Sequence, residues 1–119
     1  MDLAPRLDIL LSGGVLSEKN YANVIKIIGH FEKSYRIILN EENSAAFIAH
    51  LCIALERATR GETVNMMDDD VYEDVAGHPD YERACQICGD ILKMHPAISE
   101  AEARYLNLHL VSMLSMMEQ

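Results

Sequence analysis

Two histidines occupy similar positions in two predicted helices. His50 lies between Phe47 and Leu51, and the apolar residues around it recur at intervals of three and four, which predicts one apolar face of a helix. His109 is placed in the same way after Tyr105. A single histidine of this kind is usually a packed residue with one ring nitrogen bonded to a carbonyl. Two histidines placed alike on different helices instead suggest a functional pair.

A permanent cation accompanies the first histidine. Arg57 follows His50 by seven residues, about two helical turns, so both side chains lie near the same face of that helix. An imidazole is uncharged and titratable near neutral pH, whereas a guanidinium is always charged. This combination favours a place where added negative charge is received and balanced.

Other groups of reactive residues are better explained by structure. Cys85 and Cys88 form a CxxC that falls inside a helical pattern, and no second CxxC completes a zinc site, so core packing is favoured. The acidic run from Asp68 to Asp74 lacks the alternating ligands, central glycine and terminal glutamate of a calcium loop. It is typical of the acidic start of a short helix. We see no His–Asp dyad and no HxxxH pair, and we predict no metal and no cofactor.

Composition limits the classes of function. At 119 residues, half of them hydrophobic, the chain is long enough for one domain with its own core. Its net charge of −9 repels phosphate backbones, so nucleic-acid binding is not expected. We find no run of about eighteen apolar residues, no signal-peptide pattern and no disulfide framework among the three cysteines. We therefore expect a cytoplasmic protein that does not enter a membrane.

The first half of the chain predicts three helices. Residues 2–12 form a short helical lead that Gly13 and Gly14 end. Ser17 starts a long helix reaching about Asn40. Its predicted buried face consists of Tyr21, Ile25, Ile28, Phe31, Tyr35 and Ile38. The helix of His50 follows, capped by Asn43 or Ser44 and ended by Gly61.

The second half predicts three more helices and no strand. A short helix lies near residues 68–76, and a second begins at Pro79 and ends near Met94. Ser99 and Glu102 form a capping box that opens the last helix, which carries His109. The chain is therefore predicted to be an all-α bundle of five or six helices. We divide it into an N-terminal helical lead, 1–16, and a single helical domain, 17–119.

Three segments together resemble a known family. Residues 47–57, FIAHLCIALER, look like the first signature of the PTS regulation domain (PRD), a phosphotransferase-system module of bacterial antiterminators and activators. Residues 100–110, EAEARYLNLHL, are similar to its second signature. Residues 78–84, HPDYERA, resemble the segment between them, with His78 where the family commonly has tyrosine. The resemblance spans about residues 17–116 and is to a stand-alone, single-PRD protein.

The resemblance implies a fold and a chemistry. The fold is a compact helical bundle of two antiparallel helix pairs and a shorter cross helix, often a homodimer. Carried over by motif position, the residues phosphorylated by HPr or a sugar-transport enzyme IIB are His50 and His109. Arg57 matches the signature arginine and is the predicted partner of the added phosphate.

We therefore expect a regulatory interaction module rather than an enzyme. It would accept phosphate on His50 and His109 and change its dimer or partner binding, without a nucleic-acid-binding output domain of its own. One alternative is a phosphorylation-silent dimeric scaffold for a metabolic or transport partner. Another, less favoured, is a small helical metal-dependent hydrolase using both histidines and the acidic run from Asp68 to Asp74.

Overall fold

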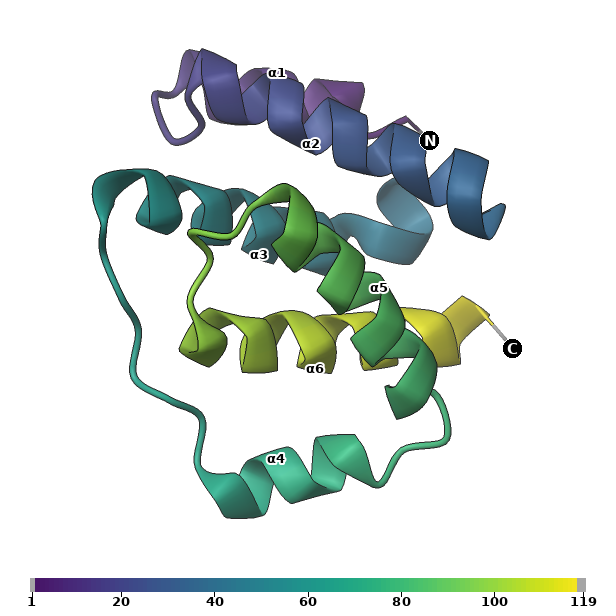
Figure 1. Ribbon diagram of the computed structural model, residues 1–119. Coiled ribbons are helices and arrows are strands. Elements are labelled where there is room, and N and C mark those ends of the chain that lie inside the picture. The colour runs from purple at the N-terminus through teal and green to yellow at the C-terminus, as the bar shows by residue number, and fades with distance from the viewer. Residues whose placement is uncertain (1, 118–119) are drawn as a thin grey trace. The chain divides into compact units, whose positions relative to one another are not determined.

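The computed structural model describes residues 2–117 and is helical throughout its regular elements (Figure 1). The elements are α1 (Ala4–Ser12), α2 (Glu18–His30), the π-helical segment η1 (Phe31–Tyr35), α3 (Glu41–Arg60), α4 (Asp69–Ala76), α5 (Tyr81–Met94) and α6 (Glu100–Met117). Six α-helices, with no strand between residues 2 and 117, confirm the all-α prediction. None of these helices is long and apolar enough to cross a membrane.

The chain forms two compact units, Met1–Glu56 and Arg57–Gln119, and the boundary between them falls inside α3. The first unit contains α1, α2, η1 and most of α3, and the second contains the last turn of α3 with α4, α5 and α6. The predicted division into a lead, 1–16, and a domain, 17–119, stays a prediction.

In the first unit, α1 and α2 run antiparallel and pack together (Figure 1). The turn between them uses Gly14 at a φ of 75°, a conformation that suits glycine. Ser17 then caps α2, because its hydroxyl accepts a hydrogen bond from the Asn20 backbone N–H at 3.2 Å. This confirms the predicted start of the second helix.

The second helix ends earlier than predicted. After His30 the chain passes into η1, and Arg36 takes a left-handed conformation with a φ of 57°, so the extension to Asn40 was wrong. The predicted buried face was also largely wrong, since only Phe31 of its six residues is buried, whereas Ile25 is 44% exposed and Ile38 is 67% exposed. The buried residues of α2 and η1 are Asn20, Val24, Ile27 and Phe31. Neighbouring isoleucines support two overlapping stripes, and packing selects the other one.

Helix α3 begins before the predicted caps. The Asn43 N–H donates to Asn40 Oδ1 and the Asn40 N–H donates to Asn43 Oδ1, both at 2.9 Å. Asn40 is therefore the cap, and Asn43 completes a reciprocal pair that resembles a capping box, so the choice of Asn43 or Ser44 was wrong. At the other end, Gly61 has a φ of 70° and its N–H donates to the Ala58 carbonyl, as predicted for a terminating glycine.

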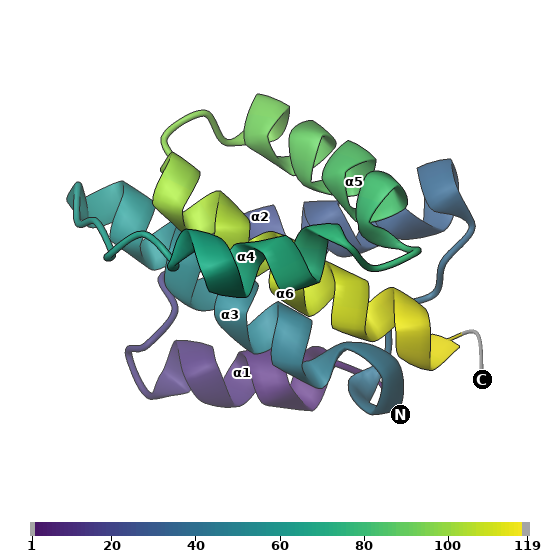
Figure 2. The same cartoon turned by 90° about the horizontal axis from the view of Figure 1, so that it is seen from below.

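In the second unit, α5 and α6 are antiparallel neighbours and the short helix α4 packs against both (Figure 2). Ser99 caps α6 by accepting the Glu102 N–H at 3.1 Å, which confirms that start. Helix α5 begins at Tyr81, just after the predicted start at Pro79, and ends at Met94, as predicted. Its inner face is made of Ala84, Ile87, Cys88 and Ile91.

The three cysteines are free thiols, and two of them belong to the core. Cys52 and Cys88 are buried, and burial raises the pKa of Cys52 to about 11 and that of Cys88 to about 12. Thiols that stay protonated at neutral pH are poor nucleophiles and poor metal ligands. These properties agree with packing as the role of the CxxC at Cys85 and Cys88.

Candidate functional site

His50 lies in the part of α3 that belongs to the first unit. The predicted apolar stripe is present, since Phe47, Leu51, Ala54 and Leu55 are all buried. The His50 side chain itself is half-buried, with its Nε2 atom shielded from solvent. The packing of the stripe fixes the rotation of α3 and therefore the direction in which this imidazole points.

Arg57, in the last turns of the same helix, is engaged with a carboxylate of the second unit. Its Nη1 atom donates to Glu102 Oε1 at 3.0 Å and to Oε2 at 3.3 Å. Glu102 is only 3% exposed, whereas the Arg57 side chain is 34% exposed. A buried carboxylate needs such a partner, because an unpaired charge inside a protein is costly. The sequence analysis assigned Glu102 only to a capping box and missed this ion pair.

His109 lies on α6 and is half-buried. It follows Glu102 by seven residues, about two turns or ~10 Å along the helix, on nearly the same face. The same interval separates His50 from Arg57 along α3. The ion pair of Arg57 and Glu102 therefore joins one residue from each signature, and each partner shares its helix face with one of the two histidines. The role of Arg57 as a phosphate partner stays a prediction.

A polar network holds α6 in the second unit. Arg104 donates to Asp69 Oδ1 at 2.8 Å and to the Met67 carbonyl at 2.9 Å, and its guanidinium lies 4.7 Å from the centre of the Tyr72 ring. Asn107 Nδ2 donates to the Tyr72 hydroxyl at 2.9 Å. These contacts fix α6 against α4 and so set the orientation of the His109 side chain.

A carboxylate also orders the first unit. The Glu56 side chain accepts hydrogen bonds from the Ser17 N–H at 3.2 Å, from the Ser17 hydroxyl at 3.0 Å and from Asn20 Nδ2. Glu56 therefore supplements the cap of α2 with a negative charge at the positive end of that helix. The result is a fixed register between the start of α2 and α3, the helix that carries His50.

The structure contains a His–Asp pair that the sequence analysis did not find. His78 Nδ1 accepts the backbone N–H of Asp80 at 3.1 Å and lies 3.6 Å from Asp80 Oδ2. Asp80 is 8% exposed, and its Oδ2 atom is buried with no hydrogen-bond partner. The two residues, at i and i+2, come together in the turn before α5 without a hydrogen bond between the ring and the carboxylate. The sequence signal was the polar pair on either side of Pro79.

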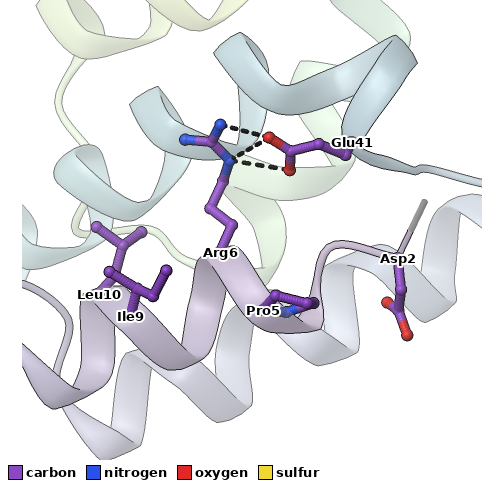
Figure 3. A pocket seen from close by; sticks show the side chains of 6 residues that line it. All are labelled: Asp2, Pro5, Arg6, Ile9, Leu10 and Glu41. Atoms are coloured by element: carbon purple, nitrogen blue, oxygen red, sulfur yellow. Dashed lines mark hydrogen bonds and ion pairs between the residues drawn. The ribbon is translucent and has the colours of Figure 1, made fainter.

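A concave feature lies on the first unit, beside α1 (Figure 3). This pocket of about 360 Å³ is lined by Pro5, Ile9 and Leu10 and by an ion pair in which Arg6 donates to Glu41. The two Arg6 Nε contacts measure 2.9 and 3.0 Å. Both charged groups of the pair are satisfied by each other, so their arrangement is structural.

The acidic run does not form a metal centre with either histidine. Between residues 2 and 117, no group of three or more His, Cys, Asp or Glu side chains is placed to hold a metal ion. Asp69 is instead bound by Arg104, at the start of α4. The hydrolase alternative stays a prediction.

Comparison with known proteins places these residues in context. A family model described as the PRD domain matches residues 25–113, which is most of the chain. No curated protein and no solved structure matches the chain. The matched range contains His50, Arg57 and His109, and also the Glu102 that binds the arginine.

Proposed function

The chain belongs to the PRD domain family, and from this premise we propose that it accepts phosphoryl groups on His50 and His109 as a module of the bacterial phosphotransferase system. PRD domains are PTS regulation domains, a regulatory rather than a catalytic family. The match across both histidines is the observation that carries the proposal. A cytoplasmic phosphohistidine protein, HPr or an enzyme IIB, is the proposed donor.

The surroundings of both histidines suit phosphoryl transfer. Both histidines are half-buried, so each ring is held by packing while part of it reaches solvent. Transfer between imidazoles needs an unprotonated acceptor nitrogen in line with the donor phosphorus, and little covalent help from other groups. The buried Nε2 of His50 means that phosphate on this atom requires local rearrangement, which couples phosphorylation of α3 to its packing.

We propose that Arg57 partners the added phosphate, in competition with Glu102. A phosphoryl group carries about two negative charges, against one for a carboxylate, and attracts the guanidinium more strongly. Moving Arg57 toward phosphate would take the guanidinium away from the buried Glu102 carboxylate, which opposes the move. Glu102→Gln removes this opposition. We expect it to lengthen the lifetime of the phosphohistidine, measured by loss of label at neutral pH.

The direct test is phosphorylation with purified components. Incubated with phosphoenolpyruvate, enzyme I and HPr, the wild-type chain should gain acid-labile phosphate that mass spectrometry maps to His50 and His109. His50→Ala with His109→Ala should remove the label from these two positions, whereas His95→Ala, a matched control outside both signatures, should retain it there. An unlabelled wild-type chain, tested also with an enzyme IIB donor, would refute the proposal.

Phosphorylation is proposed to act on assembly. Adding charge near a homodimer or partner interface shifts its equilibrium by about 1–3 kcal/mol, a typical coupling energy. The dimer fraction, measured by light scattering at several concentrations, should therefore change between the labelled and unlabelled protein. A partner bound equally by wild-type chain and by the double alanine variant would indicate the scaffold alternative. With a net charge of −9, no nucleic-acid binding is expected.

A further inference from the structure

We propose that His78 is an additional phosphoryl-acceptor site, with Asp80 as its positioning residue. The inference rests on the proposed function only for the kind of donor that would act in the cell. The placement of His78 beside the Asp80 carboxylate is a property of the turn between α4 and α5, and its effect on reactivity can be tested with a small molecule.

The two nitrogens of the His78 ring face different environments. Nδ1 points inward, 3.1 Å from the Asp80 N–H and 3.6 Å from the buried Asp80 Oδ2. Nε2, on the opposite edge of the ring, is the nitrogen left for a reaction partner, and the side chain is 33% exposed. His78 also lines an open pocket of about 390 Å³ with residues of α4 and α6. A reactant can therefore reach the exposed part of this side chain from the pocket, while Asp80 holds Nδ1.

The buried Oδ2 atom of Asp80 favours the tautomer of the His78 ring that can react. With Nδ1 accepting the Asp80 N–H, the ring proton of the neutral imidazole sits on Nε2, which then has no lone pair to attack with. Moving that proton to Nδ1 frees the Nε2 lone pair, and the proton can be donated to Asp80 Oδ2 after a small rotation of the ring. Since this oxygen otherwise has no hydrogen-bond partner, the change satisfies a buried carboxylate.

The transfer step is balanced without any further reactant. The Nε2 lone pair forms a bond to phosphorus while the bond from phosphorus to the donor nitrogen breaks, and the electron pair leaves on that nitrogen. The proton stays on Nδ1, and the positive charge that develops on the ring is held by the Asp80 carboxylate. In metal sites, a carboxylate that accepts a hydrogen bond from one ring nitrogen of a histidine likewise raises the basicity of the other ring nitrogen.

One neighbouring charge opposes the reaction. Asp74 lines the same pocket, and its carboxylate repels an incoming phosphoryl group, whereas the Ser112 and Ser115 hydroxyls can donate hydrogen bonds to it. The site is therefore expected to react faster when Asp74 is neutral. This gives the proposal a variant that should increase reactivity, which damage to the fold would not do.

Phosphoramidate is the test reagent, because it phosphorylates histidines without a protein donor and releases ammonia. The acceptor is the His50→Ala/His109→Ala chain, which keeps His30, His78 and His95. His78 should be labelled first and on Nε2, as read by peptide mapping and phosphorus NMR at neutral pH. His30 is the internal control, since its Nε2 lies 3.1 Å from the Tyr35 hydroxyl and its Nδ1 3.2 Å from the Ser34 hydroxyl.

Two substitutions separate positioning from general damage. Asp80→Asn should slow labelling of His78 by about 10- to 100-fold, the usual cost of losing such a carboxylate, and should mix the Nδ1 and Nε2 isomers. Asp74→Asn should speed it. If Asp80→Asn does not fold, the folded and urea-denatured parent chains give the same comparison, because His78 should lose its advantage over His30 on denaturation.

The proposal for His78 and the proposed function are tested by different measurements. His78 labelled no faster than His30 in the folded chain, or a rate unaffected by Asp80→Asn, would overturn this proposal. Labelling of His50 and His109 by HPr in the wild-type chain tests the proposed function separately. Failure of one arm with success of the other identifies which of the two proposals is wrong.

Discussion

The ion pair of Arg57 and Glu102 yields the sharpest stability prediction. Replacing Arg57 with methionine keeps most of the apolar stem but leaves the Glu102 carboxylate, 3% exposed, without its guanidinium. Breaking a fully buried pair in this way costs about 3–5 kcal/mol. The Arg57 side chain is 34% exposed, so water reaches the pair and reduces the expected loss to about 2 kcal/mol.

The loss can be measured by urea denaturation followed by circular dichroism. With an m-value of about 2 kcal/mol per molar urea for a chain of this size, the midpoint should fall by about 1 M. Adding Glu102→Gln to Arg57→Met should recover about half of the lost free energy of unfolding, because the buried charge is then gone. The double-mutant cycle isolates the pairwise interaction.

A matched control lies on the same helix. Arg60 pairs with Glu62 at 3.7 Å, and both side chains are more than half exposed. Arg60→Met should therefore change the free energy of unfolding by less than about 0.5 kcal/mol. If Arg57→Met had an equally small effect, or if the cycle gave no coupling, the reasoning that a buried carboxylate depends on Arg57 would be refuted.

Three further predictions follow from local features. Gly61→Ala should lower the free energy of unfolding by about 1–2 kcal/mol in a thermal melt, since φ is 70° there. At pH 8, Ellman's reagent should modify Cys85 in the folded chain but Cys88 only after denaturation, because burial raises the pKa of Cys88 to about 12. Arg6 lowers the pKa of Glu41. The pair therefore stabilises the fold above the ordinary glutamate pKa, and this contribution is lost as pH falls through the lowered pKa. Glu41→Gln should make the free energy of unfolding less dependent on pH in that range, as measured by acid denaturation.

Local chemistry explains what the sequence could predict. The stripe of Phe47, Leu51 and Leu55 has one helical register, and it is buried as predicted. Ser17 and Ser99 are caps whose hydroxyls bond an N–H three residues away, so their signal is complete within one turn. Such features depend on neighbours in the chain and are visible without the fold.

The failures occurred where distant packing decides. Ile25 and Ile27 both fit a helical stripe, and only the contacts of α2 in its unit determine that Ile27 is buried. Arg36 takes the left-handed conformation without being glycine, asparagine or aspartate, so no residue type announced the end of the helix. Asn43 was taken for the cap when its partner Asn40 holds that position.

The same distinction between local signals and distant contacts applies to the candidate site. The motif positions predict His50, His109 and Arg57 as site residues, but no periodicity could pair Arg57 with Glu102, forty-five residues away. That contact arises because the last turn of α3 and the first turn of α6 meet within the second unit. A sequence pattern assigns a charge to a helix face, and the fold then decides which charge it meets.

The identity of that partner changes how the site must be understood. A solvent-exposed arginine side chain without a carboxylate partner would bind phosphate at the cost of its own conformational entropy alone. Arg57 instead satisfies a buried carboxylate, so a phosphoryl group that draws it away must also compensate Glu102, by protonation or by another donor. Because Glu102 lies in the first turn of α6, losing the guanidinium would act at the start of the helix that carries His109. On the proposed function, this ion pair would convert a local change of charge into a change of helix packing, as a regulatory module requires.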